Sequence, residues 1–374
     1  MATDTNIAPS REFRDEVMRR GGADVARCYQ CATCSSVCEL ATEANPFPRR
    51  QVLAAQWGLE ERLAKDASVW LCHQCNDCTA RCPRDAKPGD VIQAIRGIAI
   101  EKLAFPSFMG TLVARADRTW PLLLGVPLLF WVVLLGASGS LTTASLVYHN
   151  FVPHKFIYMV FFPVTGFATV AILIGAWRFW NLLGKGAARS GSFLAHLVPV
   201  LADIVTHRRF ASCGQTVSRR WAHFILVAGF VLAAIASGLI IPAMYVFHVE
   251  LPIAFWNPMK LLGNLAAACL AVGTVWLIMN RMDHTGRTGK ATGYDWFFLV
   301  VIAVVVATGA LVEVERLAAS PRAGCLLYIL HLASVTCLFG TFPYSKFAHM
   351  VYRTLAMVHE RMAAPAGSSN QSVL

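Results

Sequence analysis

Charged residues are scarce in this chain of 374 residues: Asp, Glu, Lys and Arg make up 15% of it, whereas 56% of the residues are hydrophobic. The mean hydropathy is +0.51. This composition excludes a soluble globular protein and indicates a membrane protein. The formal net charge is +11, but the basic residues follow the loop pattern of a membrane protein, which disfavours a nucleic-acid-binding surface.

Three other absences narrow the function. No apolar segment typical of a signal peptide precedes the first cysteine cluster, so we expect the amino-terminal region to stay in the cytoplasm. No Gly-rich nucleotide fingerprint is evident, which leaves any hydride chemistry to partner proteins. Acidic residues are almost absent from the apolar segments, where Glu313 and Glu315 lie near one end. This disfavours the alternative of a transporter or ion pump with regulatory clusters.

The most specific signal is a cysteine pattern that occurs twice. Residues 28–38 and 72–82 both read C-x2-C-x2-C-x3-C, the spacing of a bacterial-type [4Fe–4S] ligand run. When two such runs face each other, the fourth cysteine of each ligates the other cluster. The spacing therefore predicts two [4Fe–4S] clusters with crossed ligands: Cys28, Cys31, Cys34 and Cys82 for cluster I, and Cys72, Cys75, Cys78 and Cys38 for cluster II.

Structural zinc and disulfides are the alternatives for these cysteines. Zinc sites usually pair two C-x2-C elements around one ion, which two identical four-cysteine runs fit poorly. Disulfides require an oxidising compartment, which a cytoplasmic segment does not reach. The other cysteines are scattered and interpreted as packing residues: Cys213, Cys269, Cys325 and Cys337.

Residues 1–118 are polar and hold 16 of the 33 Lys and Arg. Between the two cysteine runs, apolar residues recur at helical spacing after two prolines, and Asp90 to Leu103 has the pattern of an amphipathic helix. We therefore expect residues 1–118 to form a cytoplasmic, all-helical, ferredoxin-like domain with two clusters.

Six apolar segments follow, each long enough to cross a hydrocarbon core of about 30 Å. They predict a transmembrane domain over residues 119–358 and a disordered tail over 359–374. The stretch 192–205 predicts an interfacial helix. The expected fold class is all-α, with a helical two-cluster domain before a six-helix transmembrane bundle. The segments lie near residues 120–138, 156–180, 221–247, 258–280, 295–317 and 323–350.

The distribution of basic residues predicts the orientation. The three connections on one side of the bundle hold four of the 33 Lys and Arg, and the opposite side holds 29. The positive-inside rule then places both termini and the cluster domain in the cytoplasm, with a multi-pass chain in the inner membrane. The four outer residues are Lys155, Lys260, Arg316 and Arg322.

Histidines inside apolar segments are functional-site candidates, because a polar ring is costly in hydrocarbon. His331 and His349 lie 18 residues apart in the last segment. In one continuous helix this is five turns, so both rings would leave the same face about 27 Å apart. Two haems near opposite membrane surfaces require this geometry, although Pro343 between the two histidines bends helices.

Each haem requires a second ligand from another helix. His223 begins the third segment at the depth of His349, so these two are predicted to ligate one haem b. His331 would ligate a second haem with either His154 or His248. The alternative for each ring is a hydrogen bond between helices. His149 is a weaker candidate, and five histidines on the polar side are not expected to be ligands: His73, His196, His207, His284 and His359.

The segment from His331 to His349 resembles the haem-binding helix of the gamma subunit of respiratory nitrate reductases. It has the same histidine spacing and a similar Pro-aromatic-Ser-basic element before the second histidine. In the gamma subunit, the helix with the partner ligands carries a second histidine ten residues after the first. Here that position is Ala233, ten residues after His223, which leaves the second haem or its ligand open.

Over roughly residues 20–358, the fusion of a doubled-cluster domain to such a membrane domain resembles the membrane-bound C component of quinone-interacting membrane-bound oxidoreductase (Qmo) complexes. That component is itself similar to a fusion of the C and E components of heterodisulfide reductases. The resemblance implies haem b, a membrane quinone as substrate, the flavoprotein partners A and B of the same complex, and a link to adenylylsulfate reductase in sulfur metabolism.

A quinone carbonyl requires a hydrogen-bond donor close to a haem, and Lys260 begins the fourth segment on the outer side. The resemblance to the nitrate reductase helix likewise implies a quinone site near the outer haem with a lysine close by. Two alternatives stay open: Lys260 anchors a helix end, or the quinone binds on the inner side between His349 and the clusters.

Clusters and haems carry single electrons and do not transform a substrate by themselves. We therefore expect the electron-transfer subunit of a quinone-linked oxidoreductase, incomplete as an enzyme when alone. The alternatives are a heterodisulfide reductase-like membrane protein with another redox partner, and a structural anchor.

Overall fold

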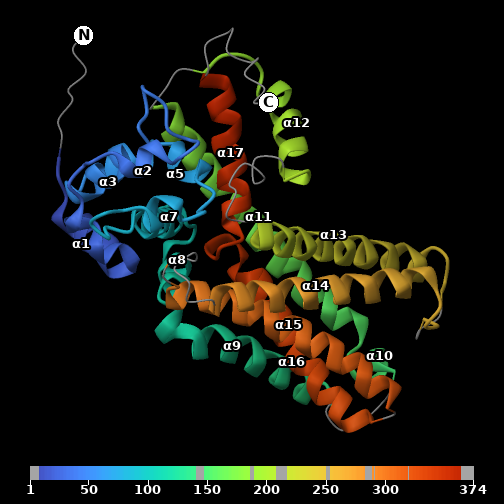
Figure 1. Cartoon of the computed structure of the whole chain (residues 1–374). Coiled ribbons are helices and arrows are strands. Elements are labelled where there is room, and N and C mark those ends of the chain that lie inside the picture. Colours follow the sequence, from blue (N-terminus) through green and yellow to red (C-terminus); the bar gives the residue numbers. More distant parts are fainter. Residues whose placement is uncertain are drawn as a thin grey trace.

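The computed structural model describes residues 8–139, 147–185, 189–207, 217–249, 253–282, 289, 291–318 and 320–363. These residues form helices and turns and contain no strand, so the predicted all-α class is confirmed. Figure 1 shows the short amino-terminal helices gathered beside α17, with the long helices extending away from them.

The amino-terminal region is built around its longest helix, α7 (Pro88–Leu103). Pro88 occupies the first turn, where a missing N–H costs nothing. The helix buries one face, including Ile92, Ile95 and Ile98, against the other short helices. The short helices of this region are α1 (Arg11–Val17), η1 (Met18–Gly22), η2 (Ala23–Arg27), α2 (Thr33–Ser36), α3 (Arg49–Gln56), α4 (Glu60–Ala64), α5 (Ser68–Leu71), α6 (Asp77–Ala80) and α8 (Ser107–Ala114).

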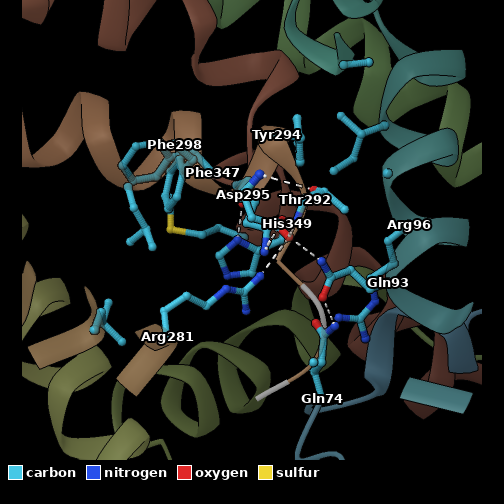
Figure 2. Close-up of a pocket in the computed structure, with 18 of the residues that line it drawn as sticks. Gln74, Gln93, Arg96, Arg281, Thr292, Tyr294, Asp295, Phe298, Phe347 and His349 are labelled. Carbon is cyan, nitrogen blue, oxygen red and sulfur yellow. Dashed lines mark hydrogen bonds and ion pairs between the residues drawn. The ribbon is translucent and has the colours of Figure 1, made fainter. Parts of the chain in front are cut away.

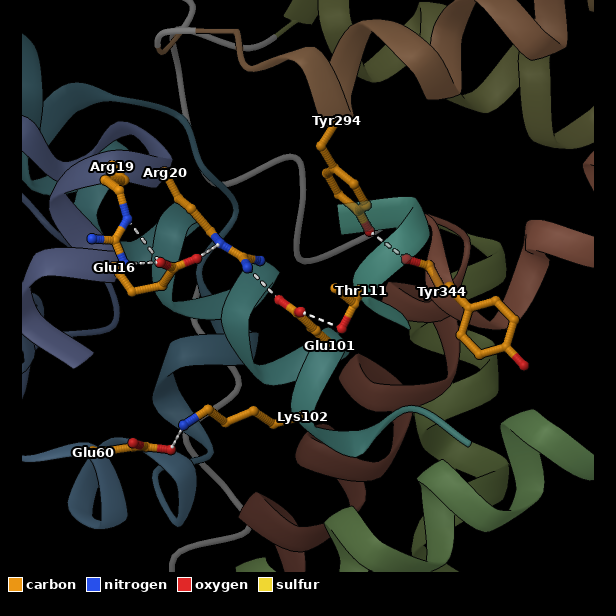
Figure 3. A network of polar contacts seen from close by, with 9 residues as sticks. All are labelled: Glu16, Arg19, Arg20, Glu60, Glu101, Lys102, Thr111, Tyr294 and Tyr344. Carbon is orange, nitrogen blue, oxygen red and sulfur yellow. Dashed lines mark hydrogen bonds and ion pairs between the residues drawn. The ribbon is translucent and has the colours of Figure 1, made fainter. Parts of the chain in front are cut away.

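A polar network holds the first helices to α7 (Figure 3). The Arg20 guanidinium forms ion pairs with Glu16 and with Glu101. The Thr111 hydroxyl donates to Glu101 at 2.9 Å. The side chains of Arg20 and Glu101 are about one fifth exposed, so the network connects α1, α7 and α8 under partial shielding from solvent.

Six helical segments of the described chain are long and apolar enough to cross a membrane, which confirms the predicted number of spans. The last of the six segments is interrupted between α16 and α17. Two shorter helices accompany them, α10 (Tyr148–Phe151) and α12 (Phe193–Val205). The long helices are α9 (Ala116–Ala137), α11 (His154–Gly184), α13 (Val217–Tyr245), α14 (Pro258–Met282), α15 (Gly293–Leu317) and the pair α16 (Pro321–Thr341) and α17 (Ala348–Ala363).

The expectation of one continuous helix from His331 to His349 is wrong. Helix α16 ends at Thr341, a 3₁₀ turn η5 (Phe342–Tyr344) follows, and Ser345 has extended backbone with φ −92° and ψ −175°. Pro343 causes the break because it lacks the N–H that would continue the helical ladder. The two histidines therefore stand on separate helices and do not share one helical face.

Helix α17 extends beyond the predicted membrane domain. It continues through residues 359–363, where the sequence predicts the start of a disordered tail. The helix persists there because His359 and Met362 are buried, and Arg361 pairs with Asp203 of α12 at 2.6 Å. The rest of that predicted tail, and also His284 and Cys213, lie outside the described residues.

Aromatic packing attaches the amino-terminal region to the long helices. The Trp70 ring of α5 lies 5.3 Å from Phe179 of α11 and 5.0 Å from Tyr352 of α17. At the helix break, the Tyr344 hydroxyl donates to the Phe105 carbonyl at 2.7 Å. The Tyr344 carbonyl accepts a hydrogen bond from the Tyr294 hydroxyl (Figure 3). The break is therefore fixed from both sides, and it directs α17 towards the amino-terminal region.

Candidate functional site

The two cysteine runs fold into similar loops. In each loop two non-glycine residues adopt left-handed backbone: Gln30 and Ala32 in the first, and Gln74 and Asn76 in the second. A one-turn helix, α2 or α6, follows each loop. Such backbone costs free energy and is typical of ligand-holding turns. The repeated sequence thus produces a repeated local structure.

The fourth cysteine of each run lies with the first three of the other run. One small cavity is lined by Cys28, Cys31, Cys34 and Cys82. The thiol of Cys38 instead interacts electrostatically with those of Cys72 and Cys75. The thiol of Cys78 interacts most strongly with Cys72, Cys75 and Cys38, and least with Cys34 of the other set. The structure therefore brings together the two crossed sets of cysteines.

The second set is largely shielded from solvent: Cys72 is buried, and Cys38, Cys75 and Cys78 are partly buried. Burial, with added repulsion from neighbouring thiolates, raises the pKa of Cys38 to about 11 and also raises the pKa of Cys78. Coordination to iron supplies the positive charge that keeps such thiols ionised. Within the described residues, no three His, Cys, Asp or Glu side chains converge on a point that suits one metal ion. A four-iron cluster is larger than one ion and suits thiols that stand farther apart.

A cavity of about 1060 Å³ is lined by residues of the second cysteine loop and of the long helices (Figure 2). Its lining includes His223 of α13 and His349 of α17. Their ring centres lie 6.4 Å apart, with an angle of 67° between the planes. A metal held by one nitrogen of each of two opposed imidazoles at about 2 Å separates the ring centres by roughly 6 Å. The pair therefore fits two axial ligands of one iron.

Further contacts orient both rings. Nδ1 of His349 lies against the carbonyl oxygen of Lys346, and Nδ1 of His223 lies 3.1 Å from Nε2 of His207. Ligating imidazoles usually have such a partner on the second ring nitrogen. The sequence interpretation set His207 aside as a polar-side residue. Its contact could not be anticipated, because it depends on how the chain returns to α13.

The remaining lining of the cavity suits a flat, acidic, largely apolar molecule. Nine lining residues are basic and three are acidic, a surplus that fits a ligand with carboxylates, as haem has in its propionates. On the apolar side, the Phe347 ring lies 4.8 Å from Phe298 and 5.2 Å from Phe342. The residues present therefore fit haem b.

Asp295 is a buried polar centre at the edge of this cavity (Figure 2). It is 2% exposed and forms ion pairs with Arg281 at 2.7 Å and Lys346 at 2.6 Å. It also accepts hydrogen bonds from the Gln93 amide at 2.5 Å and the Thr292 backbone N–H at 2.9 Å. Because two cations share this carboxylate, the centre carries net positive charge at the cavity wall.

Within the described residues, no contact joins His331 to His154 or His248, its predicted partners. Nδ1 of His331 lies 3.1 Å from the Thr308 hydroxyl of α15. The His154 ring instead stacks on His149, with centres 5.6 Å apart. His248 follows the end of α13. The contact of His331 with α15 matches the alternative of a hydrogen bond between helices.

Lys260 begins α14 and is paired. Its ammonium lies 2.8 Å from Glu313 of α15, and Arg316 lies 2.8 Å from the other oxygen of the same carboxylate. Lys260 and Glu313 are about one quarter exposed. This contact matches the alternative in which Lys260 anchors a helix end, and it leaves a hydrogen bond to a quinone untested.

The helical doubled-cysteine region and the six long apolar helices define a class, the multi-pass membrane proteins with an iron–sulfur electron-transfer domain. The profile of the 4Fe-4S dicluster domain matches residues 24–86, and that of Citrate utilization protein B matches residues 109–369. Because the second match covers more than half of the chain, the protein belongs to the citrate utilization protein B family.

Individual relatives agree with this division. The chain is 26% identical over 311 residues to Citrate utilization protein B of Escherichia coli, which covers 77% of this chain and 80% of that protein. It is 33% identical over 90 residues to the C component of the H(2):CoB-CoM heterodisulfide,ferredoxin reductase of Methanothermobacter thermautotrophicus. That second match covers 24% of this chain and 48% of the relative. No solved structure matches the chain.

These findings confirm a heterodisulfide reductase C-like iron–sulfur domain and a membrane electron-transfer protein in general terms. The chain spans about half the length of the heterodisulfide reductase relatives, so their activities are not transferred to it. The connection to the Qmo complex, to haem b and to a quinone stays a prediction.

Proposed function

We propose that the protein passes electrons between a cytoplasmic flavoprotein and the membrane quinone pool through two [4Fe–4S] clusters and a haem b. The observation that carries the proposal is the position of the second cysteine loop. Cys72, His73 and Gln74 line the same cavity as His223 and His349. A cluster held by that loop would border a haem held by the two histidines.

The crossed cysteine sets are the proposed cluster ligands, and His223 and His349 are the residues that would hold the haem. When bound, the haem supplies a one-electron carrier at the membrane surface. Contacts within the protein would orient it. His207 and the Lys346 carbonyl hold the two histidine rings, and the rings of Phe298, Phe342 and Phe347 would exclude water. The inner membrane, with both termini in the cytoplasm, is the proposed location.

Electrons exchange with the partner at cluster I. Cys31 is exposed, and the neighbouring Tyr29 is 68% exposed. The Arg84 guanidinium lies 4.0 Å from the centre of the Tyr29 ring, which places a positive charge beside this loop. An acidic surface around the flavin or cluster of a partner protein would complement it.

The family favours a particular kind of partner. The Escherichia coli relative is named for citrate utilization, so we place a flavoprotein of citrate utilization first. Adenylylsulfate reductase, acting with the flavoproteins A and B that the Qmo resemblance implies, is the second candidate. A heterodisulfide reductase-like partner is the third, because the cluster domain is similar to the C component of those enzymes.

The test is a redox-difference optical spectrum of the purified full chain, with haem and iron counted per chain. We expect low-spin haem b, iron equivalent to two four-iron clusters, and reduction of the haem by a quinol analogue. A preparation with both clusters assembled but without haem, or with a haem that quinol does not reduce, would refute the proposed path to quinone.

A further inference from the structure

Two arginines of the long helices bind the backbone of the second cysteine loop. Arg219 of α13 donates to the carbonyl of His73 at 2.6 Å and to that of Gln74 at 2.7 Å. Arg353 of α17 donates to the Cys72 carbonyl at 3.1 Å. Its guanidinium also lies 2.8 Å from Nδ1 of His73. The loop is therefore held from both helices that carry the candidate haem ligands.

The spacing of these residues is the same on both helices. Arg219 precedes His223 by four residues on α13, and Arg353 follows His349 by four residues on α17. Residues four apart lie one above the other on a helix face. Each helix thus presents one ring to the haem cavity and, one turn nearer the amino-terminal region, one guanidinium to the cysteine loop.

Comparison with the first cysteine loop shows what these contacts change. Tyr29 occupies in the first run the position of His73 in the second, and Tyr29 is 68% exposed whereas His73 is 8% exposed. The two loops have the same cysteine spacing and the same left-handed backbone positions. The two loops therefore differ in the surface that each faces. The first is exposed beside Arg84, whereas the second is bound by Arg219 and Arg353 of the long helices and, at the Cys72 carbonyl, also by Arg96 of α7.

Positive charge beside an iron–sulfur cluster affects its reduction potential. The reduced cluster carries one more negative charge than the oxidised one, and nearby guanidinium groups stabilise that extra charge. The effect is largest where solvent does not screen it. Cys72 and His73 are both less than 10% exposed, and Arg219 and Arg353 are partly buried, so solvent screens their contacts with the loop only in part.

We infer that Arg219 and Arg353 are positioning residues that couple cluster II to the histidine pair. They fix the distance from the cluster loop to His223 and His349, and they raise the reduction potential of cluster II relative to the same cluster without them. With both groups bound, one electron would be exchanged between the cluster and the carrier held by the histidines, so that one is oxidised as the other is reduced; no bond or proton is exchanged. This inference rests on the proposed function, because it requires a carrier at that pair.

A purely structural role for the two arginines is the competing explanation. Arg178 of α11 provides the matched control, since it also joins a long helix to the amino-terminal region. Its guanidinium donates to the Ala104 carbonyl at 2.9 Å, away from both cysteine runs. Loss of this contact removes an anchoring bond of the same kind without removing charge from the cluster loop.

The experiment is an EPR-monitored redox titration of both clusters in the purified full chain. Variants are Arg219→Gln, Arg353→Gln and the double variant, with Arg219→Lys and Arg353→Lys to keep the charge. In the double variant we expect the oxidised-to-reduced ratio of cluster II at fixed potential to rise at least tenfold. This corresponds to a reduction potential that is lower by about 59 mV for one electron. Cluster I should keep its potential, and Arg178→Gln should shift neither cluster.

The magnetic interaction between reduced cluster II and the oxidised haem is the second measurement. It should weaken in the glutamine variants because the loop is released from the two helices. An unchanged cluster II potential and an unchanged magnetic interaction in the double variant, with both clusters and haem retained, would overturn the inference.

If the glutamine variants lose cluster II, the lysine variants test the charge effect. A cluster II potential equal to that of the Arg178→Gln control supports the charge effect, and a shifted potential without any loss of charge contradicts it. Absence of haem from the unmodified protein would refute the proposed function instead.

Discussion

The rings of His223 and His349 face each other with their centres 6.4 Å apart, although one stands on α13 and the other begins α17. The break at η5 makes this possible. Because α16 ends before Pro343, α17 takes a new direction beside the amino-terminal region (Figure 1). Its first turn then presents His349 to the start of α13, at the edge nearest the second cysteine loop.

Replacement of either facing histidine should remove one haem. In His349→Ala or His223→Ala the iron would lose one of two axial nitrogens, so we expect the low-spin haem b signal of that site to disappear. A redox-difference optical spectrum with haem counted per chain checks this. His196→Ala is the matched control, because that residue lies in α12, does not line the cavity and is not a predicted ligand. An unchanged haem count in His349→Ala would rule out the assignment.

The crossing of the cysteine ligands gives a second prediction. Cys82 lines the cavity of the first run, so Cys82→Ser should damage the cluster held by Cys28, Cys31 and Cys34 and leave the other cluster intact. Cys38→Ser should have the converse effect. EPR spectra of the two reduced clusters distinguish these outcomes. The crossed assignment fails if Cys82→Ser damages only the cluster of the run to which Cys82 itself belongs.

The sequence was sufficient for features that depend on local spacing. The two cysteine loops follow from a repeated pattern, and the long helices follow from runs of apolar residues. The pairing of His223 with His349 was predicted from matched depth alone. The uninterrupted last helix was a wrong prediction, because Pro343 can bend or end a helix and the choice depends on tertiary contacts. Here the Tyr344 hydroxyl bonds to the Phe105 carbonyl, a contact distant in sequence.

The arginine contacts could not be predicted for a related reason. Arg219 and Arg353 have the sequence positions of ordinary basic residues at helix ends, as the positive-inside rule expects. Their targets are backbone carbonyls of the second cysteine loop. No residue type marks a carbonyl acceptor in a sequence, so only the fold places these cations beside a cluster.

Glycines determine how closely α13 and α14 pack, which gives a third prediction. A Cβ on Gly273 would lie 2.8 Å from the Leu226 backbone, and one on Gly229 would lie 2.8 Å from the Leu270 nitrogen. Gly273→Leu should therefore separate the helices, with a destabilisation of about 1–3 kcal/mol from overpacking. Thermal unfolding in detergent measures it. Gly263→Leu, on the same helix but with open space around it, should unfold like the unmodified protein; equal effects of the two variants would contradict the role of the close contact.

The last prediction concerns Lys260 and the proposed outer quinone site. The structure pairs Lys260 with Glu313, so loss of the lysine alone does not separate quinone binding from anchoring of a helix end. Glu313→Gln breaks the same ion pair and keeps the ammonium group, which makes it the matched variant. Haem retention is measured first in both proteins.

If Lys260 donates a hydrogen bond to a quinone carbonyl, Lys260→Ala should weaken inhibitor binding and slow quinol-analogue oxidation about tenfold, the effect of losing roughly 1.4 kcal/mol from a charged hydrogen bond. Glu313→Gln should then keep both properties near their unmodified values. Equal behaviour of the two variants, with haem retained, would assign Lys260 to helix anchoring. The quinone would then be sought on the inner side, between His349 and the second cysteine loop, where the Asp295 centre already places charged groups at the cavity wall.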